Sequence, residues 1–98
     1  MRDLPLFPLN TVLFPGGTIP LQVFETRYIK MINECLDSDS NFGVVLIKEG
    51  KEVGGPSIPR SVGTIAKITS INQLPNNRLL VNSVGTQRFT ILKIISDD

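Results

Sequence analysis

The sequence predicts a mainly β fold that carries one α-helix, an α+β arrangement in one small domain of 98 residues. Residues 61–95 are dense in Val, Ile and Thr and contain turn signals, which is typical of strands. Residues 26–36 instead repeat apolar side chains with helical spacing. Because a mostly antiparallel sheet must protect its edges, we expect about five to six strands curled into a half-closed pseudo-barrel.

The first two strands are predicted on either side of a glycine pair. Residues 4–14 contain prolines, which cannot donate to a ladder, so we expect either an edge strand or an irregular extended strand. Residues 18–24 place apolar side chains with period two and predict a second strand. Between them, Gly16-Gly17 is followed neither by Lys-Ser/Thr nor by a helix. We therefore interpret the pair as a bend and not as a phosphate-binding loop.

One amphipathic helix follows the second strand. Its apolar stripe comprises Tyr28, Met31, Ile32, Cys35 and Leu36. Thr26 is the predicted N-cap. Glu25 suits the positive end of the helix dipole, and Arg27 is expected to pair with Glu25 or with a strand carbonyl, so we assign structural rather than catalytic roles to both. Cys35 lies on the apolar stripe, where a thiol is expected to be buried and inert.

A buried strand and a long hairpin complete the chain. The continuous apolar run 42–48 predicts the most buried strand, covered on both faces. Residues 61–74 and 79–95 predict a hairpin, with a turn at 75–78 and a bend or bulge at 85–87. The chain ends directly after this apolar strand. We therefore expect a domain truncated before a C-terminal strand and a helical segment.

The composition excludes several classes of function. The sequence has no histidine, which removes serine–histidine and cysteine–histidine catalysis and the commonest metal ligand. Its single cysteine forms no internal disulfide and favours a reducing compartment. Neither a signal peptide nor the roughly 20 apolar residues of a membrane helix is present. We expect a cytoplasmic protein that is not an enzyme and needs no metal or cofactor.

Longer stretches of the sequence are similar to a known family. The resemblance is carried by the runs LPLFPLNTVLFPGGTIPLQVFETRYIKMINECL, FGVVLIKEGKEVGG, VGTIAKI and GTQRFTILKI. In this order they resemble the N-terminal domain of the ATP-dependent Lon protease family, and Phe-Glu-x-Arg-Tyr with Phe-Gly-Val-Val looks closer to stand-alone LON-domain proteins. Many of those have Pro in place of Thr26. The resemblance implies a PUA-like pseudo-barrel that either recognises protein substrates for proteolysis or quality control or mediates contacts between subunits. The ATPase and peptidase modules of Lon are absent, since no Walker A pattern occurs.

A recognition domain of this kind would bind exposed hydrophobic segments of polypeptides. The candidate binding residues are Phe7, Leu13, Phe14, Pro15, Val53 and Ile58, of which the last two lie in a Gly- and Pro-rich loop, 49–60. For Phe7, Leu13 and Phe14, packing in the core is the competing interpretation. The exposed-patch and core-packing interpretations are about equally favoured for these three residues.

Two other functions compete with polypeptide binding. PUA-like folds include RNA-binding modules, and residues 53–98 carry a small excess of positive charge. A basic and aromatic platform would comprise Lys48, Lys67, Arg78, Arg88 and Lys93 with Tyr28, Phe42 and Phe89. Because the net charge of the whole chain is only +1, we do not expect nucleic acid to bind. The other alternative is an architectural domain that self-associates, and no membrane contact is expected.

Overall fold

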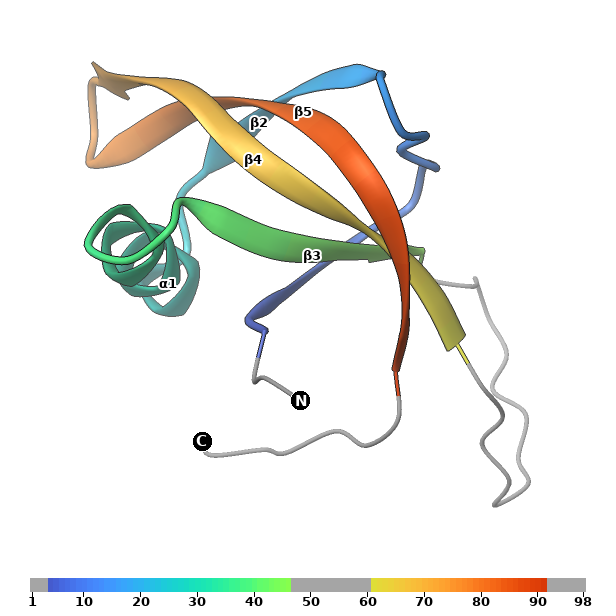
Figure 1. Cartoon of the computed structure of the whole chain (residues 1–98). Coiled ribbons are helices and arrows are strands. Elements are labelled where there is room, and N and C mark those ends of the chain that lie inside the picture. Colours follow the sequence, from blue (N-terminus) through green and yellow to red (C-terminus); the bar gives the residue numbers. More distant parts are fainter. Residues whose placement is uncertain (1–3, 47–60, 92–98) are drawn as a thin grey trace, which may run out of the picture.

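The structure is a computed structural model that describes residues 4–46 and 61–91. The elements are β1 (Leu6–Leu9), β2 (Thr18–Val23), α1 (Thr26–Leu36), β3 (Asn41–Leu46), β4 (Ser61–Leu74) and β5 (Arg78–Ile91) (Figure 1). The predicted mainly β fold with one helix is confirmed. The predicted loop 49–60 lies outside the described residues. Within them, no helix combines the length and hydropathy that crossing a bilayer requires.

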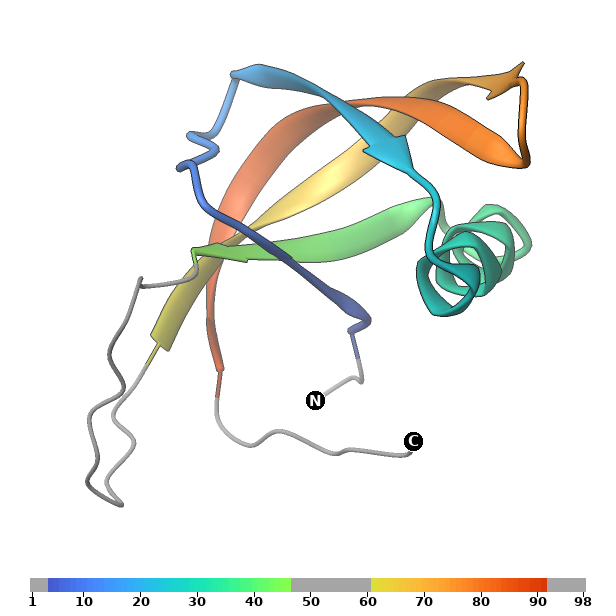
Figure 2. The same ribbon diagram turned by 180° about the vertical axis from the view of Figure 1, so that it is seen from behind.

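The strands form one mixed sheet in the order β1-β3-β4-β5-β2. β1 runs parallel to β3, whereas the other three neighbouring pairs are antiparallel. The sheet curves but does not close into a barrel, because β1 and β2 remain its two edges (Figure 2). The first strand therefore lies at an edge, as its prolines predict. β2 is the second edge, and it also contains a proline, Pro20.

β4 and β5 form the long hairpin that the sequence predicts. Asn76 and Asn77 in the connecting turn have φ of 64° and 58°, a region that asparagine tolerates better than most residues. Further along, Thr64 pairs with Arg88 and Ala66 with Gly85, so β5 contains one residue more than β4 between these pairs. This extra residue is the β-bulge predicted at 85–87.

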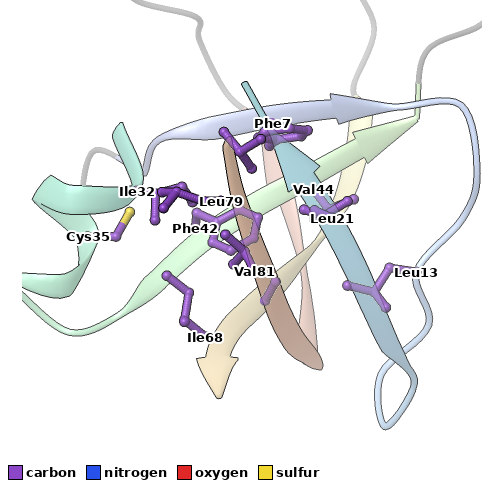
Figure 3. Packing of buried hydrophobic residues seen from close by; sticks show 12 residues of the cluster. Phe7, Leu13, Leu21, Ile32, Cys35, Phe42, Val44, Ile68, Leu79 and Val81 are labelled. Carbon is purple, nitrogen blue, oxygen red and sulfur yellow. The ribbon is translucent and has the colours of Figure 1, made fainter. Parts of the chain in front are cut away.

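The core lies on the concave side of the curved sheet, and α1 covers one end of it (Figure 3). It comprises Phe7, Leu13, Leu21, Val23, Ile32, Cys35, Phe42, Val44, Ala66, Ile68, Leu79 and Val81. Ile32 and Cys35 point from α1 toward the strands. The predicted apolar stripe is confirmed up to Cys35, but Leu36 is exposed because the helix ends there.

The start of α1 differs by one residue from the prediction. Thr26 is already helical, and Glu25 is the N-cap in an extended conformation. The Glu25 carbonyl oxygen accepts hydrogen bonds from the backbone N–H groups of Tyr28 and Ile29, both at 2.9 Å. The Glu25 side chain makes no capping hydrogen bond. The prediction of Thr26 was wrong because the N-cap is defined by this backbone geometry, which a side-chain preference does not fix.

β3 is buried in its first part only. Phe42 and Val44 face the core, while the ring of Phe89 covers the opposite face at Gly43 and Gly63, where an added Cβ would lie 2.7 Å and 2.6 Å from ring atoms. Leu46 is exposed. The prediction that the whole apolar run is covered on both faces is therefore wrong at its end, because the covering side chains reach only the middle of the strand.

Candidate functional site

The connection between β1 and β2 ends in a tight turn at residues 14–17. The Gly17 N–H donates to the Phe14 carbonyl oxygen at 2.8 Å. Pro15 occupies the second position of this turn, and Gly16 occupies the third with a φ of 87°. Proline followed by a residue at positive φ is the pattern of a type II β-turn. The predicted bend is confirmed.

This turn is fastened to the two central strands. The Gly16 N–H donates to the Gly85 carbonyl oxygen, and the Gly85 N–H donates to the Gly17 carbonyl oxygen, both at 2.8 Å. The buried hydroxyl of Thr64 on β4 donates to the Leu13 carbonyl oxygen at 2.7 Å. A Cβ at Gly85 would lie only 2.5 Å from the Phe14 carbonyl oxygen. The backbones approach so closely that only glycine fits at Gly85.

The fastened turn presents an apolar patch to solvent. Leu13 is only 4% exposed, whereas Val12 on one side is 47% and Phe14 on the other is 60% exposed. Pro15 is also exposed. We call Val12, Phe14 and Pro15 the turn patch. The guanidinium carbon of Arg88 lies 5.6 Å from the centroid of the Phe14 ring, so one cation borders the patch.

The sequence-predicted binding residues separate into three groups. Phe14 and Pro15 lie in the turn patch, whereas Val53 and Ile58 lie outside the described residues. Phe7 and Leu13 are part of the core, which corrects the expectation that they form an exposed surface. The Phe7 ring is held there by Tyr28 of α1, at a centroid distance of 4.6 Å, and sequence spacing does not reveal that contact.

A second surface lies where the sheet fails to close. β1, the end of β2 and the start of α1 enclose an open hollow of about 380 Å³. We call it the edge hollow; its lining includes Phe7, Pro8, Gln22, Phe24, Arg27 and Tyr28. Phe24 is 65% exposed, although it directly follows a fully buried valine. No local sequence pattern marks Phe24 as a binding residue, because its exposure results from the open edge of the sheet.

Two charged residues at the edge hollow have the structural roles that the sequence predicts. The Arg27 Nε lies 3.5 Å from the Glu25 Oε1, and both side chains are largely exposed. The guanidinium carbon of Arg27 also lies 4.7 Å from the centroid of the Tyr28 ring. An exposed pair of this kind contributes only about 0–1 kcal/mol to stability. Its main effect is to hold the Arg27 side chain over the ring.

The described residues show no constellation typical of catalysis. Burial raises the pKa of the Cys35 thiol, and the negative charges of Asp39 and Glu34 raise it further, which disfavours the reactive thiolate. Within the two described ranges, no three Cys, Asp or Glu side chains gather into a metal-binding group. Phe42, assigned to the RNA platform, is fully buried and offers no face for a base to stack on.

Residues 3–98 match the model of one protein family, the ATP-dependent protease La (LON) substrate-binding domain. The chain belongs to this family. The LON identity inferred from the sequence motifs is thus confirmed. The prediction that it is closer to stand-alone LON-domain proteins than to full Lon proteases stays a prediction.

Three relatives illustrate the match. Lon protease of Flavobacterium johnsoniae is 35% identical, and the aligned part covers 98% of this chain and 12% of that protein. Lon protease of Cytophaga hutchinsonii is 33% identical, with 97% and 12% covered. The crystal structure of a Lon N-terminal domain protein from Xanthomonas campestris is 37% identical and superposes with a TM-score of 0.83. The match covers 100% of this chain and 54% of that protein's chain.

These matches define what the 98 residues contain. They span about 12% of the length of the Lon proteases, and they correspond to the N-terminal substrate-binding domain. The protease and ATPase modules of Lon are not among these residues. The residues therefore correspond to the substrate-binding domain of this family, which supports the predicted non-catalytic role in substrate recognition.

Proposed function

We propose that this LON domain binds exposed hydrophobic segments of polypeptides and thereby selects substrates for proteolysis or quality control. The observation that carries this proposal is the turn patch. A large aromatic side chain, Phe14, stands 60% exposed on a turn that four backbone and side-chain hydrogen bonds hold in place. Exposed apolar surface on a rigid support is typical of a protein-interaction site.

The rigidity of the turn favours binding. A side chain on a flexible loop loses conformational entropy when a partner immobilises it, by about 0.5–1.5 kcal/mol. The Phe14 side chain still loses this entropy on binding, but the backbone beside it is already ordered, because Gly16 and Gly17 are hydrogen-bonded to Gly85. Full burial of a phenylalanine side chain contributes about 1.5–3 kcal/mol, so the part of Phe14 still exposed supplies about 1–2 kcal/mol.

The expected affinity follows from this free energy of burying Phe14. A few contacts of this size correspond to dissociation constants on the order of micromolar or weaker. Arg88 beside the Phe14 ring adds a charge preference. We expect apolar segments flanked by acidic residues to bind more tightly than the same segments flanked by lysines, and this difference to shrink as salt is added.

Fluorescence anisotropy with a labelled, permanently unfolded protein tests the proposal. Reduced and carboxymethylated α-lactalbumin is a suitable probe, and the native form with its disulfides is the reference that should not bind. Phe14→Ser is expected to weaken binding about 5–10-fold, which corresponds to about 1–1.4 kcal/mol. Leu36→Ser, which removes exposed apolar surface at the far end of α1, is the matched control and should change binding less than twofold.

Circular dichroism of both variants must show the same melting curve within a few degrees. If folded Phe14→Ser bound the unfolded probe as tightly as the wild type, the turn patch would not be the recognition surface. Self-association through the same patch is the competing prediction. In that case Phe14→Ser would lower the sedimentation coefficient of the concentrated domain and leave probe binding unchanged.

A further inference from the structure

The outer face of the sheet, which points away from the core, carries a second group of apolar side chains. Phe89, Leu4 and Leu6 converge over Gly43, where an added Cβ would lie 2.7, 2.9 and 3.0 Å from atoms of these three side chains. Residues paired across neighbouring strands point to the same face, and so do alternate residues of one strand. On these grounds the group, which we call the outer cluster, comprises Leu4, Leu6, Val45, Ile65, Phe89 and Ile91.

The outer cluster is only partly covered. All six of its side chains are half-buried. The one helix of residues 4–46 and 61–91, α1, places its buried side chains in the core and therefore does not cover the outer face. A sheet face with a contiguous apolar group is usually covered by a second layer of secondary structure. The outer cluster lacks such a layer within the two described ranges.

The other half of the outer face is built for contact with water. There the Asn82 side-chain amide donates to the Ser70 hydroxyl at 3.0 Å, and the Arg78 guanidinium donates to the Gln22 side-chain oxygen at 3.2 Å. These polar side chains satisfy one another beside Leu80, which is half-buried like the members of the outer cluster. The need for a covering layer is thus confined to the half of the face around Phe89.

The position of the chain ends indicates what covers the outer cluster. Leu4 is the first described residue and Ile91 is the last residue of β5, and both belong to the cluster. A segment that continues from β5 is therefore tethered beside it, which raises its effective concentration there. The relatives contain further chain, since nearly half of the Xanthomonas campestris protein lies outside its match with these residues.

The chemistry of the cluster determines which element fits. A strand would extend the sheet at β1 or β2, where prolines interrupt the edge, and it would not cover a face. A helix can lie across a sheet face and bury one apolar stripe against it. No charged side chain belongs to the outer cluster, so the occupant needs an apolar stripe and not a complementary charge.

We propose that the outer cluster is the docking surface of an amphipathic helix that follows residue 98 in the full-length protein. The helix packs its apolar stripe on Leu6, Ile65 and Phe89. Arg88 precedes Phe89 on β5 but pairs with Thr64 on the core side, where it borders the turn patch. The docked helix and the turn patch thus lie on opposite sides of β5, and docking leaves the turn patch open.

Hydroxyl-radical footprinting, read by mass spectrometry, tests the docking because it reports the solvent access of single side chains. The full-length protein is compared with the 98-residue chain. We expect the oxidation rates of Phe89 and Leu6 to fall about threefold or more in the full-length protein, whereas those of Leu80 and Phe14 stay within 1.5-fold. Equal rates for Phe89 in the two proteins would overturn the proposal. So would protection of Phe89 in the 98-residue chain that grows with its concentration, because a second copy would then be the occupant.

Variants of the full-length protein separate docking from an indirect effect. Ile65→Ser should restore at least half of the Phe89 oxidation rate of the 98-residue chain. Ile65→Thr, which keeps the β-branched shape, should restore a smaller part, and it serves as the second variant if Ile65→Ser does not fold. Leu80→Ser is the matched control on the polar half of the same face and should leave Phe89 protected. Full protection of Phe89 in folded Ile65→Ser would reject the docking surface, while binding of unfolded α-lactalbumin at the turn patch would stand unaffected.

Discussion

Two of the turns that hold residues at positive φ, the β4–β5 turn and the turn around Gly16, are stabilised by different interactions. In the β4–β5 hairpin, Asn76 and Asn77 lie at an exposed tip, and the Arg78 side chain donates to the Pro75 carbonyl oxygen at 3.0 Å. These partners are neighbours in sequence. The turn around Gly16 is held instead by β5 and β4, through Gly85 and Thr64.

The difference explains why only one of the turns offers a binding surface. The hairpin tip carries polar residues and is determined locally. Next to the turn at residues 14–17, the Leu13 side chain lies in the core and the Leu13 carbonyl oxygen accepts a buried hydrogen bond. These two contacts force Phe14 outward. Tertiary contacts thus supply the stability that an exposed aromatic side chain does not. Substitutions at the tertiary contacts of the turn at residues 14–17 should therefore lower the free energy of unfolding far more than substitutions in the β4–β5 turn.

Gly85→Ala is expected to have the largest effect. Its Cβ would lie 2.5 Å from the Phe14 carbonyl oxygen, so the turn must move away from β5. We expect the free energy of unfolding, measured by urea denaturation, to fall by about 2–3 kcal/mol.

Ser83→Ala, two residues earlier on the same strand, is the control for Gly85→Ala. The Ser83 hydroxyl is buried with no hydrogen-bond partner among the described residues, so its removal should be neutral or slightly stabilising. Equal losses for Gly85→Ala and Ser83→Ala would show that close approach of the turn is not the cause.

Thr64→Val tests the buried hydrogen bond to Leu13. Valine keeps the shape of threonine and suits a strand, but it leaves the Leu13 carbonyl oxygen without its donor at 2.7 Å. A loss of about 1–2 kcal/mol is expected. Thr69→Val on the same strand removes an exposed hydrogen bond to Asn82 and should change the free energy of unfolding by less than about 0.5 kcal/mol. Thermal unfolding of the two variants, measured side by side, shows whether the buried hydrogen bond contributes more to stability than the exposed one.

Gly16→Ala tests the conformation of the turn without a steric clash. No atom lies within 4 Å of a Cβ built at Gly16, but φ is 87°. The strain of an L-residue in this region is about 1–2 kcal/mol, and we expect a destabilisation of that size in chemical denaturation. A neutral result would mean that the turn adopts another conformation in solution.

Asn77→Gly in the hairpin should have the smallest effect. Glycine adopts the φ of 58° without strain, but it raises the entropy of the unfolded chain, so the two contributions nearly cancel. We expect a change of less than about 0.5 kcal/mol in the free energy of unfolding and no change in binding of unfolded protein. A large loss here would remove the contrast between the two turns.

The parts of the fold that the sequence predicts are those with local causes. The asparagines of the hairpin turn and the helical stripe each act through neighbours in the chain. Period two separates Leu13 from Phe14 but does not reveal which of them faces inward, because Thr64 decides that from β4. The exposure of Phe24 likewise depends on a sheet that does not close, which no single segment encodes.

NMR of the phenylalanine rings tests the central claim most directly. The chain has five phenylalanines, so selective ¹³C labelling gives few and resolvable signals. On addition of reduced, carboxymethylated α-lactalbumin we predict that the Phe14 ring signals shift and broaden, while those of Phe42, fully buried in the core, stay in place. If the protein bound the probe and the Phe14 signals did not move, the turn patch would not be the polypeptide-recognition surface.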